Sequence, residues 1–211
     1  MVSAVVLAAG CSKRMGKNKL LVKLDGKEIL LRTLHAVVNS KVDEVIVVTG
    51  YQASDIQKII QNLPVKIVYN PLYKEGQSTS VKAGVKAVNP NAKGVMFLLG
   101  DQPFVRPATI NMLIDNFYSL EEYSIVVPYY KGKRGNPVLF ESKLLPEIMK
   151  LTGDAGARSI ITSNPDKVFK VDIESNEIVT DIDTPEDLKL AEEFLNLNSP
   201  AIPSITFEKA H

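Results

Sequence analysis

The start of the chain contains the stretch Val5-Val6-Leu7-Ala8-Ala9-Gly10-Cys11-Ser12-Lys13-Arg14-Met15-Gly16-Lys17-Asn18-Lys19. It passes from an apolar run straight into a small, basic loop. The apolar residues 5–8 predict a buried strand. Because ligands of open parallel sheets bind beyond the carboxyl ends of the strands, the loop after this strand is the first place to expect a binding site.

The loop has the chemistry of a polyphosphate site. Small side chains at Ala8, Ala9 and Gly10 allow backbone N–H groups to approach a ligand closely. Four cations fall within seven residues of this loop: Lys13, Arg14, Lys17 and Lys19. Backbone donors together with clustered cations suit a polyphosphate. The alternative is a solvated loop in which the small residues only form a tight turn.

Two familiar phosphate-binding loops are excluded by spacing. A P-loop requires Gly, four residues and then Gly-Lys-Ser/Thr. Here five residues separate Gly10 from Gly16, and Asn18 stands at the position of the hydroxyl. The dinucleotide-binding pattern Gly-x-Gly-x-x-Gly does not occur anywhere in the chain.

The rest of the chain alternates between strand-like and helix-like segments. Apolar runs predict further strands over residues 44–49, 65–69, 94–99, 124–129, 138–140 and 168–171. Helical spacing predicts helices over residues 29–38, 54–61, 79–88, 107–118, 142–150, 155–162 and 185–195. Ser54 is expected to cap the helix over 54–61, and Pro107 suits the first turn of the helix over 107–118.

These elements predict an α/β fold with one domain over residues 1–195. Strands that alternate with helices imply a mostly parallel sheet with helices on both faces. The polar turn at 131–135 predicts a hairpin with the strand over 138–140, and therefore an antiparallel insertion. The segment 196–211 has no clear periodicity, and we expect a flexible tail or a segment that packs on a partner.

The composition excludes several classes of protein and site. The chain has 211 residues, 45% of them hydrophobic, with 25 Lys plus Arg against 24 Asp plus Glu. This even balance argues against a dedicated nucleic-acid binder. One cysteine and two histidines exclude an internal disulfide and a Cys- or His-rich metal site. No apolar run reaches the length of a membrane span, so we expect a soluble, cytoplasmic protein with no membrane partner.

Two acidic positions are candidates for a metal site. Asp101 follows the strongly apolar strand over 94–99, so it emerges at the same sheet edge as the basic loop. Asp181 and Asp183 alternate before the last helix and project to one face if that stretch is extended. A triphosphate with Mg²⁺ needs one or two carboxylates, for which Asp101 and Asp183 are the candidates. The alternatives are a turn residue at Asp101 and an ordinary helix start around Asp183.

Six segments of the chain carry a family pattern. The first is Leu-Ala-Ala-Gly at 7–10 followed by Ser12-x-Arg14-Met15-Gly16-x-x-Lys19. The others are Asn-Pro-Leu-Tyr-Lys-Glu-Gly at 70–76 with Ser80 and Gly84, Gly-Asp-Gln-Pro at 100–103, Gly-Asn-Pro-Val-Leu-Phe at 135–140, Gly-Asp-Ala-Gly-Ala-Arg at 153–158 and Asp-Ile-Asp-Thr-Pro-Glu-Asp-Leu at 181–188. Together they resemble the MobA-like nucleotidyltransferases of the molybdenum cofactor pathway, over about residues 3–195.

Within that family the chain is most similar to the cytidylyltransferases, the MocA-like branch. Guanylyltransferases typically carry Leu-Ala-Gly-Gly where this chain has Leu-Ala-Ala-Gly. The resemblance implies a Rossmann-like (GT-A-like) nucleotidyltransferase fold, mostly parallel with one antiparallel strand. It also implies transfer of CMP from CTP to molybdopterin with Mg²⁺ as cofactor, which yields molybdopterin cytosine dinucleotide and pyrophosphate.

Three alternatives to this reaction stay open. The first is a guanylyltransferase that uses GTP with the same pterin. The second is transfer from CTP or UTP to a sugar or polyol phosphate. The third is a carrier that delivers the cofactor to a molybdoenzyme client, alone or in addition to catalysis.

The resemblance also assigns roles to residues of this chain. Its nucleotide-binding positions are Leu7, Ala8, Ala9, Gly10, Arg14, Gly16, Lys19, Gly50, Asn70 and Ser80. Arg14, Lys19 and Asp101 are the expected catalytic residues: the two cations stabilise charge on the triphosphate, and Asp101 binds Mg²⁺. Asp183 is expected to share the metal, and the methyl group of Ala9 is expected to narrow the base pocket in favour of a pyrimidine. The candidates at the pterin end are Asn136 and Arg158.

Overall fold

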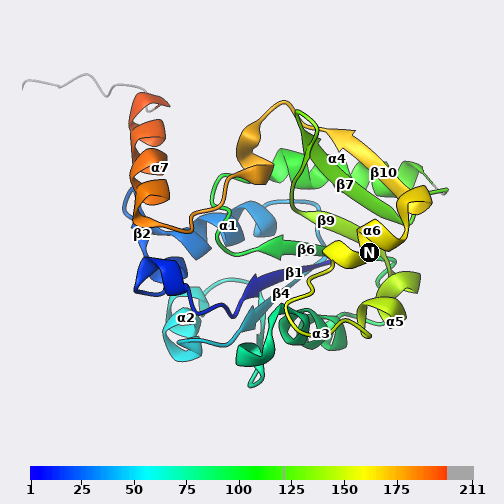
Figure 1. Cartoon of the computed structure of the whole chain (residues 1–211), viewed down its shortest axis with the longest axis horizontal. Helices are drawn as coiled ribbons and strands as arrows, with labels where there is room; N and C mark the ends of the chain where they lie inside the picture. The colour runs from blue at the N-terminus through cyan, green and yellow to red at the C-terminus, as the bar shows by residue number, and fades with distance from the viewer. Residues whose placement is uncertain (121, 199–211) are drawn as a thin grey trace, which may run out of the picture.

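The sheet is built around β1 (Val2–Ala8) in the computed structural model, which describes residues 1–120 and 122–198 (Figure 1). Within these residues the main sheet has eight strands. Seven lie in the order β5 (Lys66–Tyr69), β4 (Glu44–Thr49), β1, β6 (Gly94–Leu99), β9 (Val138–Glu141), β7 (Ile125–Tyr130) and β10 (Val168–Asp172). The eighth, β8 (Lys133–Arg134), pairs with β7.

The strands of that order run parallel except β9, which is antiparallel to both β6 and β7. This confirms the predicted α/β fold with a mostly parallel sheet and one antiparallel strand within it. The hairpin differs from the prediction, because its turn is Lys131-Gly132 rather than residues 131–135. Both turn residues have positive φ, 48° and 77°, as in the two-residue turns whose twist matches that of the strands. Residues 133 and 134 therefore form β8 instead of a turn.

Helices cover both faces of the sheet, as predicted. One face carries α1 (Ile29–Val38), α2 (Ala53–Ile60) and α4 (Pro107–Ser119), and the other carries α3 (Gln77–Ala87), α5 (Leu145–Ile148) and α6 (Arg158–Ser163). The two cores follow from β1, whose successive side chains point to opposite faces. Val6 belongs to the buried cluster of α1, α2 and α4, and Val5 belongs to that of α3, α5 and α6.

Four predicted helices have different starts, of which α3 begins at Gln77 instead of residue 79. The helix predicted over 54–61 begins at Ala53, and the carbonyl of Gln52 accepts its first hydrogen bonds, so the prediction that Ser54 caps it is wrong. Residues 142–148 form a 3₁₀ turn and the short α5, because Pro146 lacks an N–H and suits only a first turn. The helix predicted from residue 155 begins at Arg158, since the chain before it packs on the start of α3.

The remaining predicted elements are present, with bounds within three residues of expectation. The last helix, α7 (Pro185–Asn198), extends into the predicted tail, and residues 199–211 lie outside the described residues.

A separate hairpin joins β2 (Lys23–Leu24) and β3 (Lys27–Glu28). The 3₁₀ turns are Lys13–Met15, Lys19–Leu21, Tyr73–Glu75, Ser142–Leu144, Pro165–Lys167 and Asn176–Val179. None of the helices in the described part of the chain is long and apolar enough to cross a membrane.

A third apolar cluster ties α7 to the loop after β1. Figure 1 shows α7 standing beside β2, away from the helices that cover the two faces of the sheet. Met15 of the basic loop, Leu24 of β2, Ile182 and Ala191 are buried together in this cluster. The contact holds the basic loop and the segment before α7 next to each other, although they lie at opposite ends of the chain.

The strand order creates a crevice at the carboxyl end of β1. The chain moves from β1 outward to β4 and β5, and α3 then carries it back to β6 on the other side of β1. Connections that leave β1 in opposite directions open a gap between them, where ligands of open α/β sheets bind. The basic loop lies at this switch point.

Gly84 of α3 packs directly on β1. A β-carbon at this position would stand 2.4 Å from Cγ1 of the buried Val5. We expect Gly84→Ala to lower the free energy of unfolding by about 1–3 kcal/mol, because the helix must move off the sheet. Chemical denaturation measures the effect, with the exposed Lys86→Ala of the same helix as a control that should change stability by less than about 0.5 kcal/mol. A Gly84→Ala protein as stable as the parent would contradict this close packing.

Candidate active site

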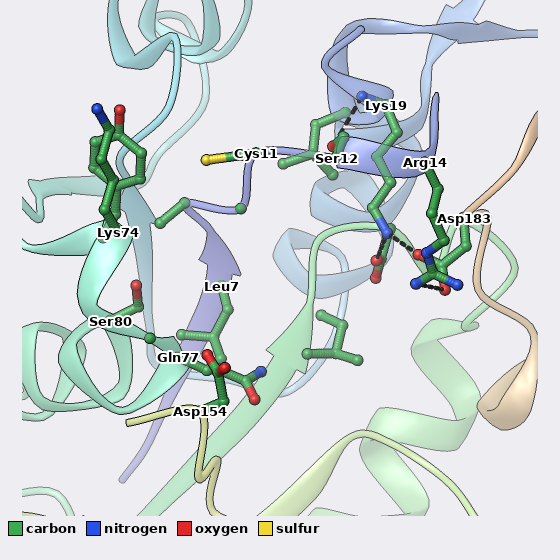
Figure 2. Close-up of a pocket in the computed structure, with 17 residues that line it drawn as sticks. Leu7, Cys11, Ser12, Arg14, Lys19, Lys74, Gln77, Ser80, Asp154 and Asp183 are labelled. Carbon is green, nitrogen blue, oxygen red and sulfur yellow. Dashed lines mark hydrogen bonds and ion pairs between the residues drawn. The ribbon is translucent and has the colours of Figure 1, made fainter. Parts of the chain in front are cut away.

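A cavity of about 720 Å³ opens at the switch point (Figure 2). Its walls come from the loop after β1, the start of α3, the end of β6 and the segments around Asp154 and Asp183. The residues predicted from sequence that line it are Leu7, Ala9, Gly10, Arg14, Lys19, Ser80, Asp101 and Asp183. The tertiary structure thus gathers most of the predicted nucleotide, catalytic and metal positions around one space.

Two cations and two carboxylates pair with one another on one side of this cavity. The Lys19 ammonium forms ion pairs with both Asp101 and Asp183, and its Nζ lies 2.5 Å from Asp183 Oδ1. Arg14 Nη2 donates to the other oxygen, Asp183 Oδ2, over 2.7 Å. Lys19 and Asp101 are largely buried, whereas 68% of the Arg14 side chain is exposed. Figure 2 shows Lys19 and Arg14 reaching from the loop side toward Asp183.

Local hydrogen bonds in the basic loop orient Lys19. The buried Asn18 side chain accepts a hydrogen bond from Leu20 N over 3.1 Å and so caps the 3₁₀ turn that begins at Lys19. The backbone N–H of Lys19 donates to Ser12 Oγ over 3.2 Å. Asn18 therefore stabilises the turn that directs Lys19 toward the two carboxylates.

Asp183 faces the cavity and does not cap α7. Thr184 Oγ1 accepts from Asp187 N, and the Asp187 carboxylate accepts from the N–H groups of Asp183 and Thr184 over 3.0 and 2.8 Å. This reciprocal arrangement is a capping box, and it satisfies the start of the helix without Asp183. Ile182 N also donates to the carbonyl of Asp101 over 3.1 Å, which fixes the two acidic segments side by side.

The charges of this cluster shift the pKa values of its members. Burial alone would lower the pKa of Lys19, but the carboxylates of Asp101 and Asp183 outweigh it and raise that pKa. Loss of hydration would raise the pKa of Asp183, but Lys19 and Arg14 hold it below its usual range. Loss of hydration and the negative charges of Asp101 and Asp183 raise the pKa of Asp181. At neutral pH, Lys19 is therefore a cation and Asp183 an anion.

Asp101 has an oxygen that fits a divalent cation. Its Oδ1 atom is buried and has no hydrogen-bond partner among the described residues. A buried carboxylate oxygen of this kind calls for a cation or a donor. Within residues 1–120 and 122–198, three or more acidic, imidazole or thiol groups do not converge into a complete metal cage. The donor set therefore fits Mg²⁺ in its usual mode, with one or two carboxylates and the remaining ligands from substrate phosphates and water.

Four of the sequence-predicted nucleotide positions do not line the cavity. Ala8 points into the core, and Gly16, with φ of 66°, forms the turn after Met15. Asn70 is buried; its amide donates to Thr79 Oγ1 and Ser80 Oγ over 2.9 and 3.0 Å. The fourth position is Gly50. A β-carbon there would stand 2.6 Å from Cβ of Tyr73. Asn70 and Gly50 thus support the cavity wall from behind.

The cavity also has lining residues that were not predicted from the sequence, among them Tyr73, Lys74, Gln77 and Asp154. Figure 2 shows Gln77 and Asp154 together at the end of the cavity away from Lys19. Gln77 begins α3 just after Gly76, whose φ is 111°, and Ser78 N donates to the Gly153 carbonyl over 3.0 Å. The glycines in these two segments were the available sequence signal, since close backbone contact requires them.

A second cavity, of about 280 Å³, adjoins the first and shares Leu7, Gln77 and Leu99 with it. It contains both residues predicted for the pterin end, Asn136 and Arg158, and also Arg134. Burial and the positive charge of Arg158 lower the pKa of Arg134, so two guanidinium groups act on each other here. Its lining also includes the apolar residues Val81, Phe97, Val138 and Ile161. This space therefore suits an anion attached to an apolar body.

The chain matches a family model and is similar to known proteins over most of its length. A model of the MobA-like NTP transferase domain matches residues 4–168. The chain is 29% identical to a molybdenum cofactor cytidylyltransferase of Escherichia coli (strain K12), over 91% of this chain and 96% of that protein. It is 32% identical to the purine catabolism protein PucB of Bacillus subtilis (strain 168), over 87% and 92%. It is 28% identical to a probable molybdenum cofactor guanylyltransferase of Thermococcus sibiricus, over 88% and 94%.

Solved structures share the architecture. Rv0371c from Mycobacterium tuberculosis H37Rv superposes with a TM-score of 0.81 and 29% identity, covering 91% of this chain and 97% of that one. A structure of the same protein in complex with manganese has a TM-score of 0.78 and 27% identity, covering 91% and 98%. The match extends over nearly the whole of both chains.

Proposed function

The chain belongs to the MobA-like NTP transferase family, and from this premise we propose that it is a cytidylyltransferase that transfers CMP from CTP to molybdopterin. The products are molybdopterin cytosine dinucleotide and pyrophosphate. The observation that carries the proposal is the cluster of Lys19, Arg14, Asp101 and Asp183 beside a cavity large enough for a nucleotide. The similarity to the E. coli cytidylyltransferase and the Ala9 methyl group support CTP as the donor.

The reaction needs alignment and charge neutralisation rather than a protein nucleophile. An oxygen of the acceptor's terminal phosphate attacks the α-phosphorus of CTP, and the bond between the α-phosphorus and the bridging oxygen breaks. Pyrophosphate leaves with the bonding electrons. The acceptor phosphate is already ionised near neutral pH, so no general base is required. Lys19 and Arg14 stabilise the negative charge that grows on the triphosphate and its leaving group.

Asp101 and Asp183 would hold the Mg²⁺ cofactor. The buried, unpartnered Asp101 Oδ1 and the adjacent Asp183 carboxylate supply oxygen ligands of the kind that Mg²⁺ prefers. When bound, the ion neutralises phosphate charge and orients the phosphates for in-line attack. The related structure with manganese supports a divalent metal in this fold.

The second cavity is the proposed site for the pterin substrate. Arg134 and Arg158 can pair with its phosphate as bidentate donors, and Asn136 can hydrogen-bond the pterin edge. Leu7, Gln77 and Leu99 lie between the two cavities, so an acceptor phosphate held there would face the nucleotide. The apolar side chains that line this cavity can pack against the faces of the ring system.

Calorimetric titration with CTP, GTP and ATP, each with and without Mg²⁺, tests the proposal. We expect Mg²⁺-dependent binding of CTP that is clearly tighter than that of GTP. Relatives of this chain include a probable guanylyltransferase, so preference for GTP would move the assignment to that activity. Failure to bind any nucleotide would contradict the enzyme assignment and favour a carrier that delivers the cofactor to a molybdoenzyme.

Ala9 offers a test of base preference. Its side chain is buried at the cavity wall, and a β-carbon built on Gly50 would lie 2.9 Å from the Ala9 methyl carbon. Removal of this methyl group should widen the base pocket at this wall. We therefore expect Ala9→Gly to lower the ratio of CTP to GTP affinity by roughly tenfold. Calorimetry with both nucleotides measures that ratio, which also cancels a general loss of affinity. An unchanged ratio would rule out Ala9 as a determinant of base choice.

A further inference from the structure

Four charged groups at the candidate active site are already neutralised by one another. Lys19 Nζ contacts one oxygen of Asp101 and one of Asp183, and Arg14 holds the second oxygen of Asp183. The proposed reaction gives the same groups different partners, because the two cations face the triphosphate and the two carboxylates face the metal. Both sets of contacts draw on the same carboxylate oxygens and the same cations, so each set weakens the other.

We propose that Lys19 and the divalent metal compete for Asp101 and Asp183, so that the metal binds tightly only when a triphosphate draws Lys19 away. The inference rests on the proposed function, from which it takes both ligands. It assigns Lys19 a second role, as the group that excludes metal from the site until a nucleotide is bound.

The available oxygens support this competition. Of the four carboxylate oxygens of Asp101 and Asp183, three contact Lys19 or Arg14, and only Asp101 Oδ1 has no hydrogen-bond partner. A hard divalent cation needs several oxygen ligands, and one carboxylate oxygen is a poor site. The Lys19 side chain is only 14% exposed, so solvent screens little of the repulsion between its ammonium and a divalent ion.

The geometry also supports release of Lys19 by a triphosphate. Lys19 and Arg14 both line the cavity, so the flexible Lys19 side chain can turn toward phosphates held there (Figure 2). Hydrogen bonds from these cations to phosphate are charge-assisted and strong. In this exchange the triphosphate pairs with the two cations and the metal pairs with the two carboxylates, so each charged side chain keeps a partner of opposite sign. By linkage, metal and triphosphate must then raise each other's affinity.

A titration of the full chain with Mn²⁺, in a solution without nucleotide, tests the competition. The electron paramagnetic resonance signal of free Mn²⁺ reports how much of the ion remains unbound. We expect Lys19→Met to bind Mn²⁺ at least about tenfold more tightly than the parent protein. Lys27→Met removes an exposed charge of β3 that lies outside the cavity lining, and it should change Mn²⁺ affinity less than about twofold. The double variant Lys19→Met with Asp101→Asn should lose the tight site.

A second measurement uses CTP in the presence of a chelator. Loss of the Asp101 charge frees Lys19 for the triphosphate, so Asp101→Asn should bind metal-free CTP at least about fivefold more tightly than the parent. A residue that only supported the fold would not strengthen binding. This arm keeps the inference testable if Lys19→Met is poorly folded.

The outcomes separate the inference from the proposed function. Equal Mn²⁺ affinity in the parent and in Lys19→Met would overturn the competition while leaving the metal site intact. Absence of Mn²⁺ binding in both proteins would overturn the competition and the proposed metal ligands together. CTP binding measured in parallel then shows whether the nucleotide site survives.

Discussion

Lys19→Ala is expected to lower the turnover of nucleotidyl transfer by about 10²–10³-fold, and Arg14→Ala should fall on the same scale. Both side chains line the cavity, and in the proposed mechanism they supply the positive charge that stabilises the departing pyrophosphate. Their loss should mainly raise the free energy of the transition state, because negative charge on the leaving group increases there. Pyrophosphate release with CTP, Mg²⁺ and molybdopterin measures the turnover.

The control for this pair is Lys27→Ala. Lys27 is an exposed cation of β3 that does not line the cavity, so its removal should leave turnover within about twofold of the parent. Thermal unfolding of all three variants checks that they remain folded. Unchanged turnover in both Lys19→Ala and Arg14→Ala would show that these cations do not act on the triphosphate.

Glu177→Ala is expected to lower the free energy of unfolding by about 3 kcal/mol. Glu177 is only 3% exposed, and its carboxylate accepts hydrogen bonds from the backbone and guanidinium of Arg106 and from Thr109 Oγ1. These contacts fasten the segment before Asp183 to the start of α4. Truncation leaves the buried Thr109 hydroxyl and the Arg106 N–H without their acceptor.

Urea denaturation of Glu177→Ala measures this loss. Glu174→Ala is the matched control, because Glu174 is exposed and the change should stay within about 0.5 kcal/mol. Glu177→Gln retains one acceptor oxygen and should recover part of the stability. If Glu177→Ala unfolds at the same urea concentration as Glu174→Ala, the buried carboxylate does not hold this segment.

Most of the fold could be predicted from the sequence because its causes are local. The β-branched run at 44–49, the apolar run at 94–99 and the helical spacing at 29–38 have the predicted bounds. Burial patterns of this kind repeat every two or 3.6 residues and need no knowledge of distant segments. The position of Asp101 at the carboxyl edge of the sheet follows from the strand that precedes it.

The predictions from sequence are wrong where the path of the backbone, and not the residue types, decides the local conformation. Ser54 has the chemistry of a cap, but the chain enters α2 through Gln52, whose φ is 50°. The polar residues 131–135 predict one longer turn, but positive φ at Lys131 and Gly132 closes the turn in two residues. The residue types alone do not distinguish the observed cap and turn from the predicted ones, because both are compatible with the same polar and glycine residues.

The arrangement of the site was decided by contacts between segments that are far apart in the chain. The sequence before α7 suited Asp183 either as part of the helix start or as a site residue. The tertiary structure resolves this, because the Thr184–Asp187 pair caps the helix and Ile182 bonds to the carbonyl of Asp101. The ion pairs of Lys19 form because the basic loop, the end of β6 and the segment before α7 pack against one another. Local periodicity carries no information about that packing, so the sequence predicted the residue types and the sheet edge, and the tertiary structure determined which side chains meet.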